Sequence, residues 1–248
     1  MSYKKHKPRA THFLPQWSCL VQIIVEQFSK QQNSEFLYME NPILIFGAGN
    51  LGKIALDIFN RNEVLVFGFL DDDKALHGKE IGEIFVLGDT DDDGFLKLIG
   101  NKTEAFVALE NNKERKKVVE MLINRRKVMP VNAIHNKAVV SEIAQIGHGN
   151  LVAARGVVNP YATVGNHCII NASVVIDINA KVGNYVQIGA GAIINSDVEI
   201  EEGAFIGSGA VIISGVKVGK NARVGAGSVV VENVADASTV FGNPAKKI

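Results

Sequence analysis

The second half of the chain repeats a hydrophobic position every six residues. When the sequence is divided into hexads from Val139, the second place is Val or Ile in all sixteen hexads, from Val140 to Val230. The sixth place is Ala, Gly, Ser, Cys or Val in fifteen of them, and Asn150 is the exception. A fixed short period of this kind is typical of a β-helix, in which each repeat contributes one strand and one turn.

The period also predicts the dimensions of the β-helix. Three hexads close one coil of eighteen residues, so sixteen hexads give a little over five coils. With ~4.8 Å between strands, the prism should be roughly 25 Å tall. The Val and Ile places fill the interior, while Gly and Asn adopt left-handed turn conformations at the corners. Because the core is filled, ligands should bind on the outside of the prism or between copies of it.

Residues 41–132 show a different pattern, in which apolar runs alternate with helical spacing. We expect strands at 42–46, 63–73, 83–89, 104–109 and 128–134, and helices at 50–60, 93–100 and 112–125. Strands that alternate with helices predict a parallel sheet with right-handed crossovers.

A glycine-rich loop joins the first of these strands to the first helix. Gly47, Gly49 and Gly52 have the G-x-G-x-x-G spacing, and Asp71 lies 19 residues after the last of them. Such glycines permit a tight turn and close approach to a phosphate, and the acid can bind a ribose hydroxyl. The loop is compatible with an NAD-dependent oxidoreductase, with a nucleotide-sugar site or with a simple strand-to-helix turn, and the motif alone does not separate these.

Composition excludes several classes of protein. Lys plus Arg and Asp plus Glu both number 26, so the net charge is zero, which argues against nucleic acid as the partner. The chain has two cysteines, Cys19 and Cys168, which argues against a disulfide scaffold and against a cysteine zinc site. We expect no bound metal.

Residues 1–40 differ from the rest of the chain. They begin with a basic stretch, and their apolar run is interrupted by Gln22 and Glu26. That run is shorter than the ~20 residues of a membrane span, and no signal-peptide cleavage site follows it. We expect a poorly ordered extension, no membrane span and a cytoplasmic protein.

The order of motifs resembles a known family. "ILIFGAGNLGK", "FLDDDK", "ALENNKERKK" and "IHNKAVVS" precede the hexads, and "VFGNPAKKI" follows them. Over residues 41–248 the chain is similar to the bacterial hexapeptide-repeat sugar acyltransferases, which include UDP-4-amino-sugar N-acetyltransferases and sialic acid O-acetyltransferases. The resemblance implies a Rossmann-like α/β domain at 41–132 that binds the nucleotide-sugar, and a left-handed parallel β-helix at 133–248. It also implies a homotrimer that uses acetyl-CoA rather than NAD.

The resemblance further implies site residues on both sides of the reaction. Asp71 and Asp72 match the acidic pair that receives the uridine of a UDP-linked sugar. The acetyl-CoA groove lies between adjacent β-helices, at Gln187, Ser208 and Ala226. The remaining matches on the acceptor side are Gly47, Gly49, Asn50, Leu51, Asn111 and Asn171.

Several positions depart from the family pattern. The catalytic His and the acid after it are replaced by Ile178 and Asn179, which leaves Asp177 as a substitute base in the same turn. A family glycine is Glu110, and the His that contacts the coenzyme is Gln187. A general base is typically worth about 10²–10⁴ in rate, although an amine that is already neutral can react without one.

Two histidines within the hexads, His148 and His167, are other candidate bases. Their spacing from Ile178 places them near a different corner of the prism. His135 is expected to close the start of the β-helix, and Cys168 to fill an inward place as a packing residue.

Three hypotheses follow. We expect an acetyltransferase that acts on an amino or hydroxyl group of a nucleotide-sugar or related sugar, because the residues of the donor groove and the C-terminal tail persist. The alternative is a catalytically impaired homologue that binds ligands or acts as a scaffold. The third hypothesis is a nicotinamide enzyme joined to a β-helix. For the third hypothesis the sequence offers no catalytic Tyr–Lys or His pair.

Overall fold

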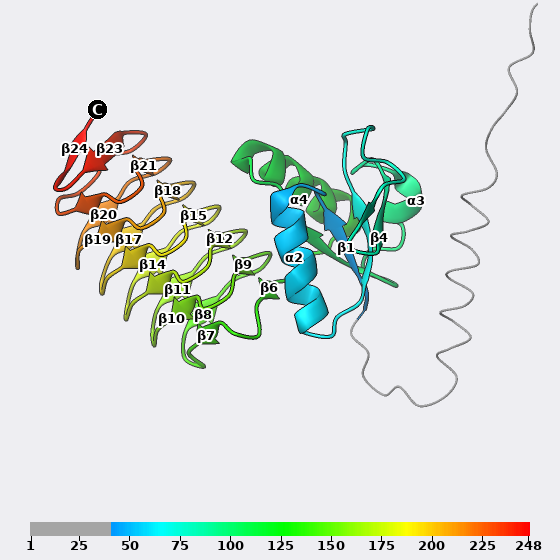
Figure 1. Ribbon diagram of the computed structural model, residues 1–248, viewed down its shortest axis with the longest axis horizontal. Coiled ribbons are helices and arrows are strands. Elements are labelled where there is room, and N and C mark those ends of the chain that lie inside the picture. The colour runs from blue at the N-terminus through cyan, green and yellow to red at the C-terminus, as the bar shows by residue number, and fades with distance from the viewer. Residues whose placement is uncertain (1–40) are drawn as a thin grey trace, which may run out of the picture. The chain divides into compact units, whose positions relative to one another are not determined.

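A five-stranded sheet organises the first part of the chain in the computed structural model, which describes residues 41–248 (Figure 1). Its strand order is β3-β4-β2-β1-β5, and β3 is the one antiparallel strand. The strands are β1 (Ile43–Phe46), β2 (Val66–Leu70), β3 (Glu80–Ile81), β4 (Ile84–Gly88) and β5 (Glu104–Val107). The expected extension at residues 1–40 lies outside the described residues.

Helices cover both faces of this sheet. On one face α2 (Asn50–Arg61) buries Ala55 and Ile58. On the other face α4 (Asn112–Arg126) buries Val119 and Leu122, beside the short α3 (Asp93–Leu96). The alternation of strands and helices expected from the sequence is confirmed as far as α4. Over residues 41–248 no helix combines the length and the apolar character needed to cross a bilayer.

Two details of the sheet differ from expectation. The segment 128–134 adds no strand to it: Val131 donates one hydrogen bond to the Ala105 carbonyl, and the chain then leaves. Ala133–Ile134 (β6) instead pairs with β9 (Leu151–Val152) of the β-helix. Pro130, which has no N–H to donate, precedes this departure. The unexpected β3–β4 hairpin turns through Gly82 and Glu83, both at positive φ, as type I′ turns require.

The rest of the chain is a left-handed parallel β-helix with three sheets (Figure 1). One sheet contains β7 (Val139–Val140), β10 (Val157–Val158), β13 (Val175–Ile176), β16 (Ile193–Ile194), β19 (Val211–Ile212) and β22 (Val229–Val230). The second contains β8 (Gln145–Ile146), β11 (Thr163–Val164), β14 (Lys181–Val182), β17 (Glu199–Ile200) and β20 (Lys217–Val218). The third contains β6, β9, β12 (Ile169–Ile170), β15 (Gln187–Ile188), β18 (Phe205–Ile206), β21 (Arg223–Val224), β23 (Thr239–Gly242) and β24 (Ala245–Lys247).

The eighteen-residue coil is confirmed by the strand register. Strands pair with the residue one coil ahead, for example Val175 with Ile193, without an insertion across the sixteen hexads. Every second-place residue from Val152 to Val230 is buried. The last coil is shorter by two residues, since Arg223 pairs with Thr239.

Asn150 and Ser228 are polar residues at the inward sixth place of the hexads, and Asn150 is hydrogen-bonded through both ends of its side-chain amide. Its Oδ1 accepts from the Cys168 N–H at 2.7 Å, and its Nδ2 donates to the Gly165 carbonyl at 2.9 Å. Cys168 occupies the same corner one coil later, where its thiol donates to the Gly183 carbonyl at 3.0 Å. Burial raises the pKa of this thiol to about 12, so the expected packing role of Cys168 is confirmed.

The first place of each hexad points outward, and the three outer faces differ because different types of residue occupy this place. The face formed by β7, β10, β13, β16, β19 and β22 carries only Val and Ile there, and we call it the apolar face. The face of β8, β11, β14, β17 and β20 carries Gln, Thr, Lys and Glu, and we call it the polar face. The third, the docked face, buries Leu151 and Ile169 in a cluster shared with α2.

Candidate functional site

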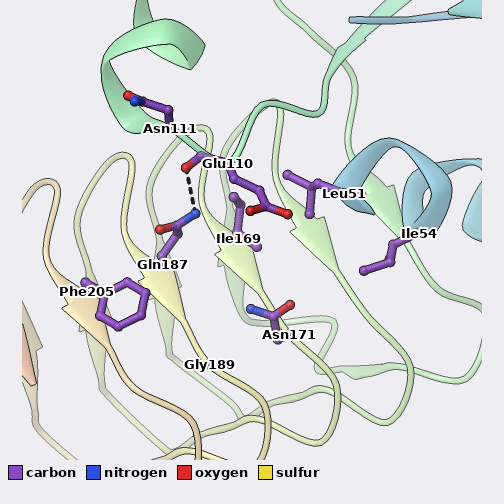
Figure 2. A pocket seen from close by; sticks show the side chains of 9 residues that line it. All are labelled: Leu51, Ile54, Glu110, Asn111, Ile169, Asn171, Gln187, Gly189 and Phe205. Carbon is purple, nitrogen blue, oxygen red and sulfur yellow. Dashed lines mark hydrogen bonds between the residues drawn. The ribbon is translucent and has the colours of Figure 1, made fainter. Parts of the chain in front are cut away.

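A cavity of about 570 Å³ lies between the docked face of the β-helix and residues of the α/β part (Figure 2). Its wall combines residues of α2, of the loop between β5 and α4, and of three successive coils of the β-helix. The lining residues are Leu51, Ile54, Glu110, Asn111, Ile169, Asn171, Gln187, Gly189 and Phe205.

The sheet topology explains why the cavity lies there. From β1 the chain crosses to β2 on one side, and β5 later pairs with β1 on the other side. Loops at the carboxyl ends of β1 and β5 therefore diverge at a topological switch point, which is where open α/β sheets bind ligands. Leu51 follows β1, while Glu110 and Asn111 follow β5.

Hydrogen bonds fix the polar part of the wall. Gln187 Nε2 donates to the Glu110 carbonyl at 2.9 Å, which ties the β-helix to the loop after β5 (Figure 2). Asn171 Nδ2 donates to the Ile188 carbonyl at 2.9 Å. The Asn111 side chain caps α4 by accepting from the Lys113 N–H at 2.9 Å.

A buried guanidinium holds this loop from behind. Arg115 of α4 is 1% exposed and donates to the backbone carbonyls of Leu109, Glu110 and His167, as well as to Asn112 Oδ1. Burial lowers its pKa to about 10, so it remains charged at neutral pH. The sequence places Arg115 in a charged amphipathic helix, and nothing in that pattern indicates burial.

The hexad histidines lie at the corner between the polar and docked faces. His167 is 3% exposed, and its ring packs on Tyr185 with centroids 5.0 Å apart. Burial, and then the nearby charges of Arg115 and His148, lower the pKa of His167 to about 4. Neither histidine lines the cavity, and the expectation that they lie at a different corner from Ile178 is confirmed.

The carboxylates of Asp71 and Asp72, which follow β2, accept hydrogen bonds from nearby backbone N–H groups. Asp71 accepts from the Ala48 N–H at 2.8 Å through Oδ2 and from the Asp73 N–H at 2.9 Å through Oδ1. Asp72 Oδ1 accepts from both the N–H and the hydroxyl of Thr90. These carboxylates hold the glycine loop and the turn beside it, and they lie outside the cavity lining.

The glycine loop is shaped by close backbone contacts. Gly47 has φ of 107°, and a Cβ there would lie 2.7 Å from the Ala108 carbonyl oxygen. A Cβ on Gly52 would lie 2.1 Å from the Gly47 carbonyl oxygen. Gly49 and Asn50 begin α2, but among the predicted loop residues Leu51 alone reaches the cavity.

Ser208 and Ala226 share one corner of consecutive coils, next to the cavity residue Gly189. No acceptor among the described residues meets their backbone N–H groups. A Cβ on Gly189 would lie 2.4 Å from Ser208 N, and one on Gly207 would lie 2.4 Å from Ala226 N. The glycines therefore leave these amides open to a ligand, and we call this place the open-amide corner.

Asp177 lies at the opposite corner, between the apolar and polar faces. Its Oδ1 accepts from Asn159 Nδ2 and from the Ile178 N–H, both at 2.8 Å. Ile178 is 40% exposed, and neither residue lines the cavity of its own chain. Over residues 41–248 no three His, Cys, Asp or Glu side chains gather as a metal site would require.

Both parts of the chain match known protein families. The model of the PglD N-terminal domain family matches residues 42–122, and that of the bacterial transferase hexapeptide family matches residues 179–214 and 197–232. The solved structure of PerB from Caulobacter crescentus, in complex with CoA and GDP-perosamine, is 30% identical, with a TM-score of 0.77 over 86% of this chain and 100% of PerB. The chain belongs to the hexapeptide-repeat sugar acyltransferase family.

Two further solved structures are similar to this chain over nearly their whole length. The acetyltransferase domain of PglB from Neisseria gonorrhoeae, in complex with acetyl coenzyme A, is 27% identical, with a TM-score of 0.76 over 85% of this chain and 100% of that domain. WeeI from Acinetobacter baumannii is 26% identical, with a TM-score of 0.74 over 84% of this chain and 99% of that protein. None of the curated proteins matches the sequence.

The cavity brings together four of the predicted site residues, namely Leu51, Asn111, Asn171 and Gln187. The sequence motifs and the resemblance assign no site role to Ile54, Ile169, Gly189 or Phe205, which also line the cavity. The hexad period held a usable signal for the β-helix residues, because Ile169, Gln187 and Phe205 are eighteen residues apart at one outward place.

Proposed function

We propose that the protein transfers the acetyl group of acetyl-CoA to an amino group on a nucleotide-linked sugar. The α/β part at 41–132 would bind the nucleotide-sugar, and the β-helix at 133–248 would bind the coenzyme. One observation carries the proposal: the open-amide corner runs directly into the cavity at Gly189. A thioester lying along that corner would present its carbonyl to an acceptor held in the cavity.

The chemistry of acyl transfer agrees with this arrangement. The reaction needs a thioester held close to the nucleophile and N–H donors for the developing oxyanion. The N–H groups of Ser208 and Ala226 are available to a coenzyme at this corner. The relatives PerB and the PglB domain, crystallised with CoA and acetyl coenzyme A, support the same donor here.

An amine is favoured over a hydroxyl as the acceptor. The place of the family base is Ile178, and the carboxylate of the neighbouring Asp177 is engaged in turn hydrogen bonds. A hydroxyl depends strongly on a base, whereas a neutral amine attacks a thioester by itself. GDP-perosamine in the PerB complex supports a nucleotide-linked amino-sugar, and UDP remains the nucleotide that the sequence resemblance implies. Both substrates would be met in the cytoplasm.

The apolar face supports a homotrimer. Its outward residues are Val and Ile on six consecutive strands, and Val139 and Ile193 are exposed in the single chain. Continuous apolar surface of this kind is normally covered by a partner. Packing of three copies through this face would bring a neighbouring chain to the groove beside the open-amide corner.

Ligand binding tests the proposed function directly. Thermal unfolding should be measured with acetyl-CoA, with UDP- and GDP-linked 4-amino-sugars, and with NAD. A ligand at 100 times its Kd stabilises the folded state by about 2.7 kcal/mol. We expect acetyl-CoA and one amino-sugar nucleotide to raise Tm and NAD to leave it unchanged. No shift with acetyl-CoA would exclude the proposal.

The trimer is tested by a charge on the apolar face. Val175→Lys should convert the trimer to monomer in light scattering, because three buried charges would meet in one interface. Thr163→Lys places the same charge at the same hexad place of the polar face, and should leave the trimer intact. A trimer that survives Val175→Lys would show that another surface assembles it.

The second candidate is a catalytically impaired homologue that binds ligands or acts as a scaffold. Ile178 favours it, because an apolar side chain occupies the family's place for the base. Mass spectrometry of the sugar nucleotide after incubation with acetyl-CoA separates the two candidates. Binding of both substrates without formation of the N-acetylated product would establish the impaired homologue.

A further inference from the structure

We propose that Glu110 binds the ammonium group of the acceptor sugar and accepts the proton that this nitrogen loses before acyl transfer. The inference rests on the proposed function and adds a residue that replaces the missing base. It concerns a position at which the chain departs from the pattern of its relatives, where a glycine is expected.

The Glu110 side chain points into the cavity (Figure 2). Figure 2 shows the Glu110 carboxylate pointing into the space between Leu51 and Ile169, on the side of the cavity that holds Asn171. The side chain is solvent-accessible in the single chain, so a ligand from solution can reach it.

The backbone of Glu110 is held on two sides. Its carbonyl accepts from Gln187 Nε2 at 2.9 Å and from Arg115 Nη1 at 3.1 Å. One donor comes from the β-helix and the other from the buried Arg115 in the first turn of α4. The carboxylate therefore projects from a fixed point rather than from a freely moving loop, as a catalytic group requires.

The lining of the cavity contains one charged side chain, that of Glu110. No cationic side chain among the described residues pairs with it. Arg115 is close in sequence, but its donors are directed to backbone carbonyls and to Asn112. The lining thus presents one carboxylate without an ion-pair partner among apolar and amide groups, which favours a cationic ligand group.

The proton balance of the reaction gives this charge a use. An amino-sugar in its ammonium form has no lone pair, so Glu110 Oε must first take one proton. The neutral nitrogen then attacks the thioester carbonyl carbon, a C–N bond forms, and the C–S bond breaks. The second proton leaves nitrogen for the thiolate, which departs as CoA thiol, and the proton on Glu110 is released to solvent.

The decisive measurement compares ligands with and without the ammonium group. Calorimetric titration should be done with GDP-perosamine, with a UDP-linked 4-amino-sugar, and with the N-acetylated form of each. Glu110→Gln should weaken binding of the preferred amine form at least ~10-fold and leave binding of its N-acetylated form within about twofold. Glu114→Gln removes the same charge one turn into α4, outside the cavity lining, and should change neither affinity.

Kinetics complete the test. Glu110→Gln should lower kcat/KM for the amino-sugar about 10²–10⁴-fold, without changing the affinity for acetyl-CoA. If the wild type transfers acetyl groups and Glu110→Gln equals it in both assays, the role of Glu110 is refuted and the proposed function stands. If the amine form binds through Glu110 but no product forms, the acetyl-transfer proposal fails and the ammonium site stands. If the wild type binds no amine form, both are overturned.

Discussion

Acidification should destabilise the fold through His167. This imidazole is 3% exposed, and burial lowers its pKa from 6.5 to about 4 in the folded chain. Its Nδ1 lies so close to Gly149 that a Cβ on the glycine would be 2.2 Å away. The folded state therefore resists protonation of a group that the unfolded chain protonates readily.

The magnitude follows from this difference in pKa. Because the folded pKa is the lower one, the stabilisation is complete above pH 6.5 and is lost as the pH falls toward 4. Between pH 7.5 and pH 5 the free energy of unfolding should fall by about 2 kcal/mol from this residue alone. At pH 4 the loss should reach about 3 kcal/mol.

Urea unfolding at a series of pH values measures the effect. Carboxylates also titrate in this range, so the comparison is between wild type and variants that cannot ionise. His167→Asn accepts the positive φ of 58° at this position, and His167→Phe keeps a ring against Tyr185. Both variants should lose about 2 kcal/mol less than the wild type between pH 7.5 and pH 5, whatever their stability at neutral pH.

The reasoning would be refuted by parallel pH profiles. If wild type and both variants lose the same stability between pH 7.5 and pH 5, His167 is already protonated or exposed in the folded state. A flatter profile in His167→Phe alone would point to a packing effect of the phenyl ring, because His167→Asn removes the same titration.

Two further predictions concern the groove. Gly207→Ala places a methyl group 2.4 Å from Ala226 N and should weaken acetyl-CoA binding at least ~10-fold in calorimetry. The control Gly183→Ala places a methyl group 2.8 Å from Glu202 N at another corner, and it should leave the affinity for acetyl-CoA unchanged. In the Glu110→Gln background, Ile178→His with Asn179→Glu should raise acetyl transfer about 10–10²-fold by restoring the family's base, and unchanged turnover would show that this corner does not reach the acceptor. The Glu places a side chain at φ of 60°, so Tm should fall slightly.

The sequence predicts the β-helix in detail because one physical constraint is repeated. The prism has a single narrow core, and each coil must place a β-branched residue inside at the same phase. Val152 and Ile194 therefore occupy equivalent inward places although they lie in different sheets. The segment 128–134 has no such repetition. Its apolar residues fit a sheet strand or the first strand of the prism equally well, and tertiary pairing of β6 with β9 decides between them.

The sequence reveals only part of the candidate site, because the site combines residues of the α/β part with residues of the hexad repeat. Gln187 and Asn171 were identified through the resemblance, whereas Ile54 and Phe205 line the cavity only because α2 and β18 meet it from different parts of the chain. Arg115 illustrates the same limit. A charged residue in a charged helix gives no sign of burial, and its role depends on carbonyls at Leu109 and His167 that the fold brings to it.

The buried guanidinium also explains how an unpaired carboxylate can coexist with a nearby cation. Arg115 donates its hydrogen bonds to three backbone carbonyls and one amide oxygen. It therefore fixes the loop after β5 without forming an ion pair with the Glu110 carboxylate. An ion pair between Arg115 and the Glu110 carboxylate would draw that carboxylate out of the cavity and cancel its charge. Because the guanidinium binds the main chain instead, the same residue that anchors Glu110 leaves its carboxylate available to an amine. Glu110, at which this chain departs from its family, is thus anchored by Arg115, the most deeply buried charged residue of α4.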